Sequence, residues 1–169
     1  MYMKEKKYSH GIYYCDADRS TGTSNTEQQA KKRFKEVYEE VERGANPDLD
    51  KREVIPMIAL RMVESWLLSD KNAFELVYGA SAVRDSDISF PAKPEYLWGK
   101  EEDPKSNYPK NYLKRICSSF HKKGKIPFDK QLYADLAEQT DIEVLCKKCP
   151  VSFGTFKKDM ETYLLHVFS

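Results

Sequence analysis

Two carboxylates follow an apolar, aromatic stretch near the start of the sequence. Asp16 and Asp18 follow residues 11–15, Gly-Ile-Tyr-Tyr-Cys, whose residue types favour a β-strand. Side chains two residues apart in a strand point to the same face, so this pair is suited to share a hard cation such as Mg²⁺ or Mn²⁺. Open α/β sheets bind their ligands beyond the carboxyl ends of strands. Asp is also common in turns, so a plain loop after the strand is the alternative interpretation.

A third carboxylate is expected close to this pair. The run 54–59, Val-Ile-Pro-Met-Ile-Ala, predicts a second buried strand with its proline at an edge or strand end. A helix follows over residues 60–70, and Glu64 lies beside its apolar stripe. If the two strands are neighbours, the Glu64 carboxylate approaches Asp16 and Asp18. The alternative is a surface glutamate paired with Arg61 or Lys71.

The elements that position these residues form a strand, helix and strand unit. A capping box at Ser24-Asn-Thr-Glu27 and a stop at Gly44 bound a helix with apolar residues at helical spacing. This order predicts a right-handed βαβ crossover and a small parallel sheet. We therefore expect an α/β part over residues 1–70 and a helical lobe over 71–169, packed as one compact unit.

The helical lobe is predicted from caps and apolar periodicity. Asp70 begins a short helix that ends at Gly79. Longer helices are expected over 108–120, 130–138, 142–147 and 153–167, the last capped by Ser152. No further strand is expected after Asp70, so the fold class is α/β with a mainly helical carboxyl-terminal half.

A basic segment lies between residues 100 and 125. It holds eight basic residues against three acidic ones, although the whole chain has a net charge of only +1. Lys105, Lys110, Lys114 and Arg115 are the candidates for phosphate contacts. The interleaved aromatic residues Tyr108, Tyr112 and Phe120 are of the types that stack on bases. The alternative is a solvated helix face.

Composition and cysteine usage limit which other classes of protein and of metal site the chain could belong to. Cys117, His121, Cys146 and Cys149 offer a possible zinc set, but their spacing is unlike paired Cys turns, and Cys15 and Cys117 are expected to be small buried hydrophobes. No apolar run approaches the roughly 18 residues that a membrane span needs. The polar, basic amino terminus is not a secretory signal, so we expect a cytoplasmic protein that does not enter membranes.

Four stretches, in this order, resemble a known family. They are the strand ending in Asp16-Ala-Asp18, the block 62–70 (Met-Val-Glu-Ser-Trp-Leu-Leu-Ser-Asp), the segment from Pro94-Glu95 to residue 105, and Cys149-Pro-Val-Ser-Phe153. The chain is similar, over most of its length, to the prokaryotic domain of unknown function that is related to Toprim (topoisomerase-primase) domains. That family is often encoded beside an AAA or ABC-type ATPase, in an arrangement suggestive of phage defence.

The resemblance implies a Toprim-like fold and Mg²⁺-dependent phosphodiester chemistry. Asp16 and Asp18 match the Asp-x-Asp motif of Toprim domains. The earlier glutamate motif has no counterpart, because only fifteen residues precede Asp16. The resemblance thus implies either an amino-terminally shortened member or one in which Glu64 or a partner's carboxylate completes the site.

Two functions remain open at this point. The first is a nuclease component of a nucleic-acid-targeting defence system that works with an ATPase, with Asp16, Asp18 and Glu64 as metal ligands. The second is a non-catalytic module that docks on the ATPase. Aromatic residues expected to be exposed favour the second reading; they are Tyr96, Trp98, Tyr108 and Tyr112.

Overall fold

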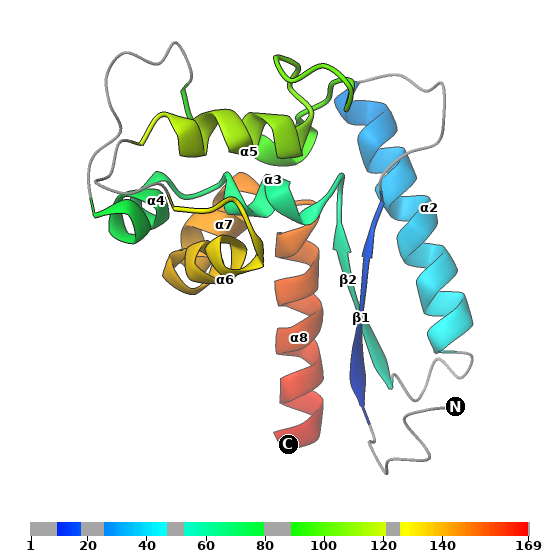
Figure 1. Cartoon of the computed structure of the whole chain (residues 1–169). Coiled ribbons are helices and arrows are strands. Elements are labelled where there is room, and N and C mark those ends of the chain that lie inside the picture. The colour runs from blue at the N-terminus through cyan, green and yellow to red at the C-terminus, as the bar shows by residue number, and fades with distance from the viewer. Residues whose placement is uncertain (1–9, 18–25, 47–52, 80–88, 121–125, 169) are drawn as a thin grey trace.

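A two-stranded parallel sheet lies between two long helices in the computed structural model (Figure 1). The structure describes residues 10–17, 26–46, 53–79, 89–120 and 126–168, without the side chains of 166–168. Strand β1 (Gly11–Asp16) pairs with β2 (Val54–Ala59) in a register that runs from Gly11 opposite Val54 to Asp16 opposite Ala59. Helix α2 (Glu27–Ala45) connects the strands. The predicted α/β class with a small parallel sheet is confirmed.

Alternate residues of the strands pack against different helices. Cys15 of β1 and Ala17, just after it, pack with Ile58 of β2 and Leu60, just after it, against the apolar face of α2. Met57 and Ala59 point to the opposite face, where they pack with α7 (Ile142–Lys148) and α8 (Phe153–Phe168). This period of two is that of an extended chain, and it makes a three-layer arrangement with β2 at its centre.

Helix α2 begins later than its sequence signal indicated. Thr26, not Ser24, is the N-cap, and its hydroxyl accepts a hydrogen bond from the Gln29 N–H at 3.3 Å. Glu27 is therefore the first helical residue and cannot act as the third residue of a capping box. Ser24 itself lies outside the described residues. Glu27 forms an ion pair with Lys93 instead, at 2.7 Å.

Two short helices follow β2. Helix α3 (Val63–Leu67) precedes α4 (Lys71–Tyr78), which begins at Asp70 and ends at Gly79 as predicted. Gly79 has a φ of 61°, a left-handed conformation that glycine adopts without strain. The buried Asp70 carboxylate caps α4 through the Asn72 N–H and also accepts from the Asp141 N–H at 3.0 Å.

The carboxyl-terminal half is helical, and its boundaries lie within two residues of those predicted. Residues of α3, α4 and the following helices form one core cluster around Phe74. The core therefore crosses the boundary proposed near residue 70. The remaining elements are the 3₁₀ turn η1 (Pro94–Tyr96), α5 (Pro109–Ser118), α6 (Lys130–Gln139) and the helices α7 and α8 introduced above.

Candidate functional site

Asp16 ends β1 at the carboxyl edge of the sheet. Its Oδ1 accepts a hydrogen bond from the Tyr14 hydroxyl at 2.5 Å. The two side chains meet because residues two apart in a strand share a face. The Tyr14 ring in turn meets the edge of Trp66 on α3, with ring centroids 6.4 Å apart. Asp16 is exposed.

Glu64 lies at the start of α3, five residues after β2. It is only 9% exposed, and its Oε1 accepts a hydrogen bond from the Tyr133 hydroxyl of α6 at 3.0 Å. No lysine or arginine within the described ranges forms an ion pair with Glu64. The sequence alternative of a surface glutamate paired with Arg61 or Lys71 therefore does not hold; Lys71 pairs with Glu75 at 3.0 Å.

Both carboxylates act on the same phenol. Burial raises the pKa of Tyr14, the hydrogen bond and charge of Asp16 raise it further, and the charge of Glu64 adds to the effect. Burial and Glu64 likewise raise the pKa of Tyr133. Asp16 and Glu64 therefore both contribute to the raised pKa of Tyr14.

The third carboxylate of the predicted set, Asp18, lies outside the described residues. Among the residues that are described, no three His, Cys, Asp or Glu side chains come together closely enough to hold a metal ion. The described part of the candidate site is therefore a pair of carboxylates, Asp16 and Glu64, flanked by Tyr14 and Tyr133. Carboxylate oxygens are ligands that Mg²⁺ and Mn²⁺ favour.

A buried polar chain supports this pair from the side of α8. The Trp66 indole N–H donates to the Ser152 hydroxyl at 2.9 Å, and that hydroxyl donates to the Glu95 carboxylate at 2.8 Å. The Trp66 ring also meets Phe153 edge-on at 5.3 Å. The chain therefore runs from Glu95 through Ser152 and Trp66 to the Tyr14 ring.

Glu95 is completely buried without a basic partner among the described side chains. Besides the Ser152 hydroxyl, its carboxylate accepts the backbone N–H groups of Val151 and Ser152, at 3.3 and 3.1 Å, just before α8. Burial raises the pKa of Glu95, while these hydrogen bonds oppose the rise. A carboxylate at a helix N-terminus is favoured by the helix dipole. Ser152 precedes α8 as predicted, but its hydroxyl joins Trp66 to Glu95.

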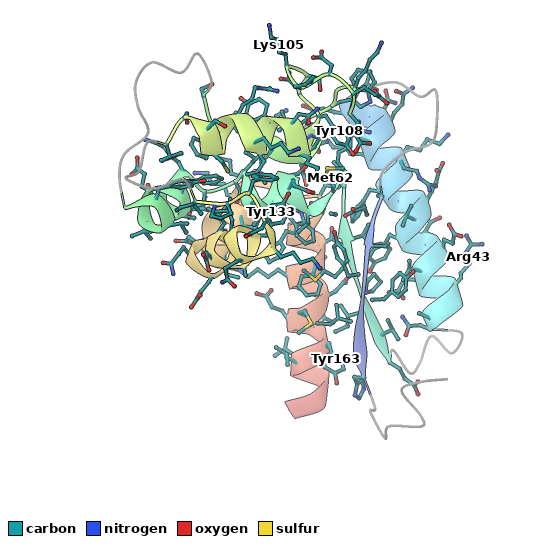
Figure 2. All side chains as sticks on the ribbon, viewed as in Figure 1. Arg43, Met62, Lys105, Tyr108, Tyr133 and Tyr163 are labelled. Atoms are coloured by element: carbon teal, nitrogen blue, oxygen red, sulfur yellow. The ribbon has the colours of Figure 1, made fainter. Side chains whose placement is uncertain are left out.

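The basic segment divides into exposed lysines and one engaged arginine. Lys105, Lys110 and Lys114 are exposed, and Lys105 stands at the outer end of its loop (Figure 2). Lys110 and Lys114 are four residues apart on α5 and share one face. Lys114 also lies over the Phe128 ring, 5.6 Å from its centroid.

Arg115 is occupied by the loop that precedes α5. Its Nη1 donates to the carbonyls of Pro104 and Ser106 at 2.7 and 2.6 Å, and its guanidinium lies over the Tyr112 ring. The Asn111 amide donates to two further loop carbonyls at 2.8 and 2.9 Å. Arg115 thus fixes the loop, while the three lysines remain the stronger candidates for phosphate contacts.

An open hollow of about 550 Å³ lies beside this loop. It is lined by Lys114 and Arg115 together with acidic and polar groups, so its charge is mixed. Its lining residues are Glu101, Pro104, Asn111, Lys114, Arg115, Ser118 and Ser119.

Most of the aromatic residues of this region are less exposed than the sequence predicted. Phe120 is only 5% exposed and stacks on Tyr78 with centroids 4.9 Å apart, so it cannot stack on bases. Tyr112 packs against the same core, and its hydroxyl donates to the Ser89 carbonyl. Tyr96 and Tyr108 are half-buried, whereas Trp98 is 41% exposed.

The described cysteines do not come together as the possible zinc set would require. Cys117 belongs to the core around Phe74, whereas Cys146 and Cys149 pack with the α8 face of the sheet. The three thiols do not converge, and His121 lies outside the described residues. Burial raises the pKa of Cys117 to about 11, in agreement with a small buried hydrophobe.

A family profile matches residues 5–161 of the chain, and the family is described as a domain of unknown function (DUF4276). The chain belongs to this family. No curated protein and no solved structure is detectably similar to this DUF4276 domain. None of the helices in the described ranges is both long and apolar enough to cross a membrane.

Sequence reasoning missed the partners of the two carboxylates. Tyr14 could have been found from its spacing, since a residue two before Asp16 in a strand must share its face. Tyr133 gave no such signal, because it is 69 residues from Glu64 and comes from another helix. Nothing in the sequence of Pro94-Glu95 shows that the Glu95 carboxylate would be buried.

Proposed function

We propose that this DUF4276 domain is a Toprim-like, Mg²⁺-dependent or Mn²⁺-dependent component of a nucleic-acid-targeting defence system. In this proposal it cleaves phosphodiester bonds in the cytoplasm together with an AAA or ABC-type ATPase. The proposal is supported by Asp16, which accepts a hydrogen bond from the Tyr14 hydroxyl, and by Glu64, whose charge helps to raise the pKa of the same tyrosine. They come from separate elements: Asp16 is the last residue of β1, and Glu64 follows β2. Open α/β folds bind their ligands beyond the carboxyl ends of strands.

The residues have separate roles in this proposal. Asp16, Asp18 and Glu64 hold the cation, and Tyr14 and Tyr133 orient the two described carboxylates. A bound divalent cation would stabilise the charge that develops on the transferring phosphate. Lys105, Lys110 and Lys114 contact the nucleic-acid backbone away from the reacting bond.

Cleavage of labelled single-stranded and double-stranded DNA and RNA tests the proposal, with the protein alone and with its ATPase. We expect cleavage with Mg²⁺ or Mn²⁺ that EDTA abolishes. Asp16→Asn and Glu64→Gln should each remove it. Glu36→Gln is the matched control, because the Glu36 carboxylate is half-exposed on α2 and its loss should leave the activity unchanged. Metal-independent cleavage, or activity that both site variants retain, would contradict the proposal.

A second candidate function is the non-catalytic module that docks on the ATPase. Its support is Trp98, a large aromatic side chain that is 41% exposed beside a well-braced loop. Tryptophan is enriched at interfaces. If Trp98→Ala abolished ATPase binding and defence while the Asp16→Asn variant kept both, this second function would replace the first.

A further inference from the structure

The indole of Trp66 is fixed beside the candidate site by two kinds of contact. Trp66 is 4% exposed and packs with Leu145, Cys149 and Phe153 on the α8 side of the sheet. Its N–H donates to the Ser152 hydroxyl at 2.9 Å. The indole is therefore held both by apolar packing and by a directed hydrogen bond.

Glu95 fixes the direction of that hydrogen bond. An indole N–H is a donor only, and a serine hydroxyl has a single proton. The Ser152 hydroxyl donates this proton to the Glu95 carboxylate at 2.8 Å, so its oxygen accepts from Trp66. Glu95 and Ser152 are both buried, which shields the two bonds from solvent. The buried polar chain thus holds the indole in one orientation.

Tyr14, by contrast, is placed by few contacts. Its side chain is 45% exposed, so solvent covers much of it. Its ring meets Trp66 with ring centroids 6.4 Å apart and an interplanar angle of 67°. Edge-on aromatic pairs of this kind are favourable beyond the area that they bury. The rotamer of Tyr14 therefore depends on where the Trp66 indole lies.

Helix α3 is linked to both described carboxylates of the candidate site. Glu64 lies on this helix, and Trp66, two residues later, meets the tyrosine that donates to Asp16. Residues two apart on a helix do not share a face, so Glu64 reaches Tyr133 of α6 while Trp66 reaches α8 and β1. Figure 1 shows α3 above the first turn of α8, at the carboxyl end of the sheet.

We propose that Trp66 is a positioning residue for the candidate metal site. Its indole, which Ser152 and Glu95 orient, sets the rotamer of Tyr14. Tyr14 in turn sets the direction of the Asp16 carboxylate. This inference rests on the proposed function, because it gives Trp66 a role in metal binding at Asp16. Residues that orient a metal ligand typically change the metal affinity about 10–100-fold when they are replaced.

Mn²⁺ affinities measured by isothermal titration calorimetry test this role. Trp66→Phe removes the indole N–H and shortens the ring, and Ser152→Ala leaves that N–H without its acceptor. We expect each variant to bind Mn²⁺ roughly tenfold more weakly than wild type. Addition of Ser152→Ala to Trp66→Phe should weaken binding no further, because Ser152 acts through the indole N–H. The control is Val37→Ala on α2, across the sheet, which should lower stability and leave the affinity unchanged.

An NMR signal of Tyr14 reads its orientation without any metal. In protein with ¹³C-labelled tyrosine rings, the Tyr14 resonance is the one that Tyr14→Phe removes. Ser152 is linked to Tyr14 through the Trp66 ring. In the metal-free protein, Ser152→Ala should therefore shift or broaden the Tyr14 resonance, and Val37→Ala should leave it in place. If Trp66→Phe fails to fold, Ser152→Ala still serves for both measurements.

The two measurements separate this inference from the proposed function. If wild type, Trp66→Phe and Ser152→Ala bind Mn²⁺ equally well, the positioning role is wrong and the metal site stands. If wild type binds no Mn²⁺, the proposed function is wrong, and the Tyr14 resonance still decides whether Trp66 orients Tyr14. A Tyr14 resonance that is the same in Ser152→Ala and in wild type would overturn the inference, whatever the metal affinity.

Discussion

Replacement of Glu95 by alanine should destabilise the protein more than any exposed glutamate would. The Glu95 carboxylate accepts two backbone N–H groups and one hydroxyl before α8. A buried donor that loses its acceptor costs about 1–3 kcal/mol. Val151 is half-buried and the Ser152 hydroxyl can rotate, so the low end of this range applies to each of these two donors. Removal of a buried carboxylate offsets part of the total loss. We expect a loss of about 3 kcal/mol.

Thermal unfolding followed by circular dichroism at neutral pH measures this loss. For a chain of this length, about 3 kcal/mol corresponds to a drop in Tm of roughly 6–12 °C. The control is Glu102→Ala, at an exposed position in the loop before α5, which should change stability by no more than about 0.5 kcal/mol. A drop below about 2 °C for Glu95→Ala, or equal drops for both variants, would refute this reasoning.

The pH dependence of stability gives a second, independent test of Glu95. The folded-state pKa of Glu95 is raised above its unfolded value, so its protonated form is the one that the folded state favours. Its contribution to stability is present below the unfolded pKa and is lost as pH rises through the folded pKa. The free energy of unfolding of wild type should therefore fall relative to Glu95→Gln across that window. If the free energy of unfolding of wild type rose with pH relative to that of Glu95→Gln, the result would contradict the burial of this carboxyl group.

Two further predictions concern the loop and the thiols. A Cβ at Gly99 would lie 2.5 Å from the Tyr108 backbone nitrogen, whereas one at Gly44 meets nothing within 4 Å. In urea titrations, Gly99→Ala should lower the free energy of unfolding by about 1–3 kcal/mol, and Gly44→Ala, within α2, should raise it by up to about 1 kcal/mol. Equal effects of the two substitutions would contradict the close approach at Gly99. Cys117 and Cys149 are buried with raised pKa values. A thiol reagent at pH 8 should therefore label Cys15 and Cys146 first, and Cys117 and Cys149 only on unfolding. Rapid labelling of all four cysteines in the native protein would be inconsistent with this burial.

Local signals in the sequence were sufficient for most of the elements. The caps at Asp70 and Gly79 and the apolar periodicity of the later helices are properties of adjacent residues, and the structure confirms them. The parallel pairing of β1 and β2 was also predicted, because a strand, helix and strand of this length have few other arrangements. The N-cap of α2 was wrong, since Thr26 and Ser24 are equally suitable by type and the choice depends on tertiary contacts such as that of Glu27 with Lys93.

The partners of the candidate site depended on contacts far apart in sequence. Glu64 was expected near the strand ends. Its hydrogen bond with Tyr133 of α6, however, joins segments that lie dozens of residues apart, and so does the buried polar chain from Glu95 to Trp66. No spacing rule reaches that far. Arg115 was predicted to contact phosphate because it lies in a basic run, and its Nη1 hydrogen bonds to the loop carbonyls could not be predicted from that run.

Isothermal titration calorimetry with Mn²⁺ and Mg²⁺ tests the central claim most directly. The account predicts binding to the wild-type protein, and an affinity at least roughly tenfold lower, or about 1.4 kcal/mol weaker, in Asp16→Asn and in Glu64→Gln. Glu36→Gln should bind as wild type does. Absence of divalent binding to the folded protein at millimolar metal, with and without the ATPase, or equal binding by all four proteins, would contradict a metal site at Asp16 and Glu64.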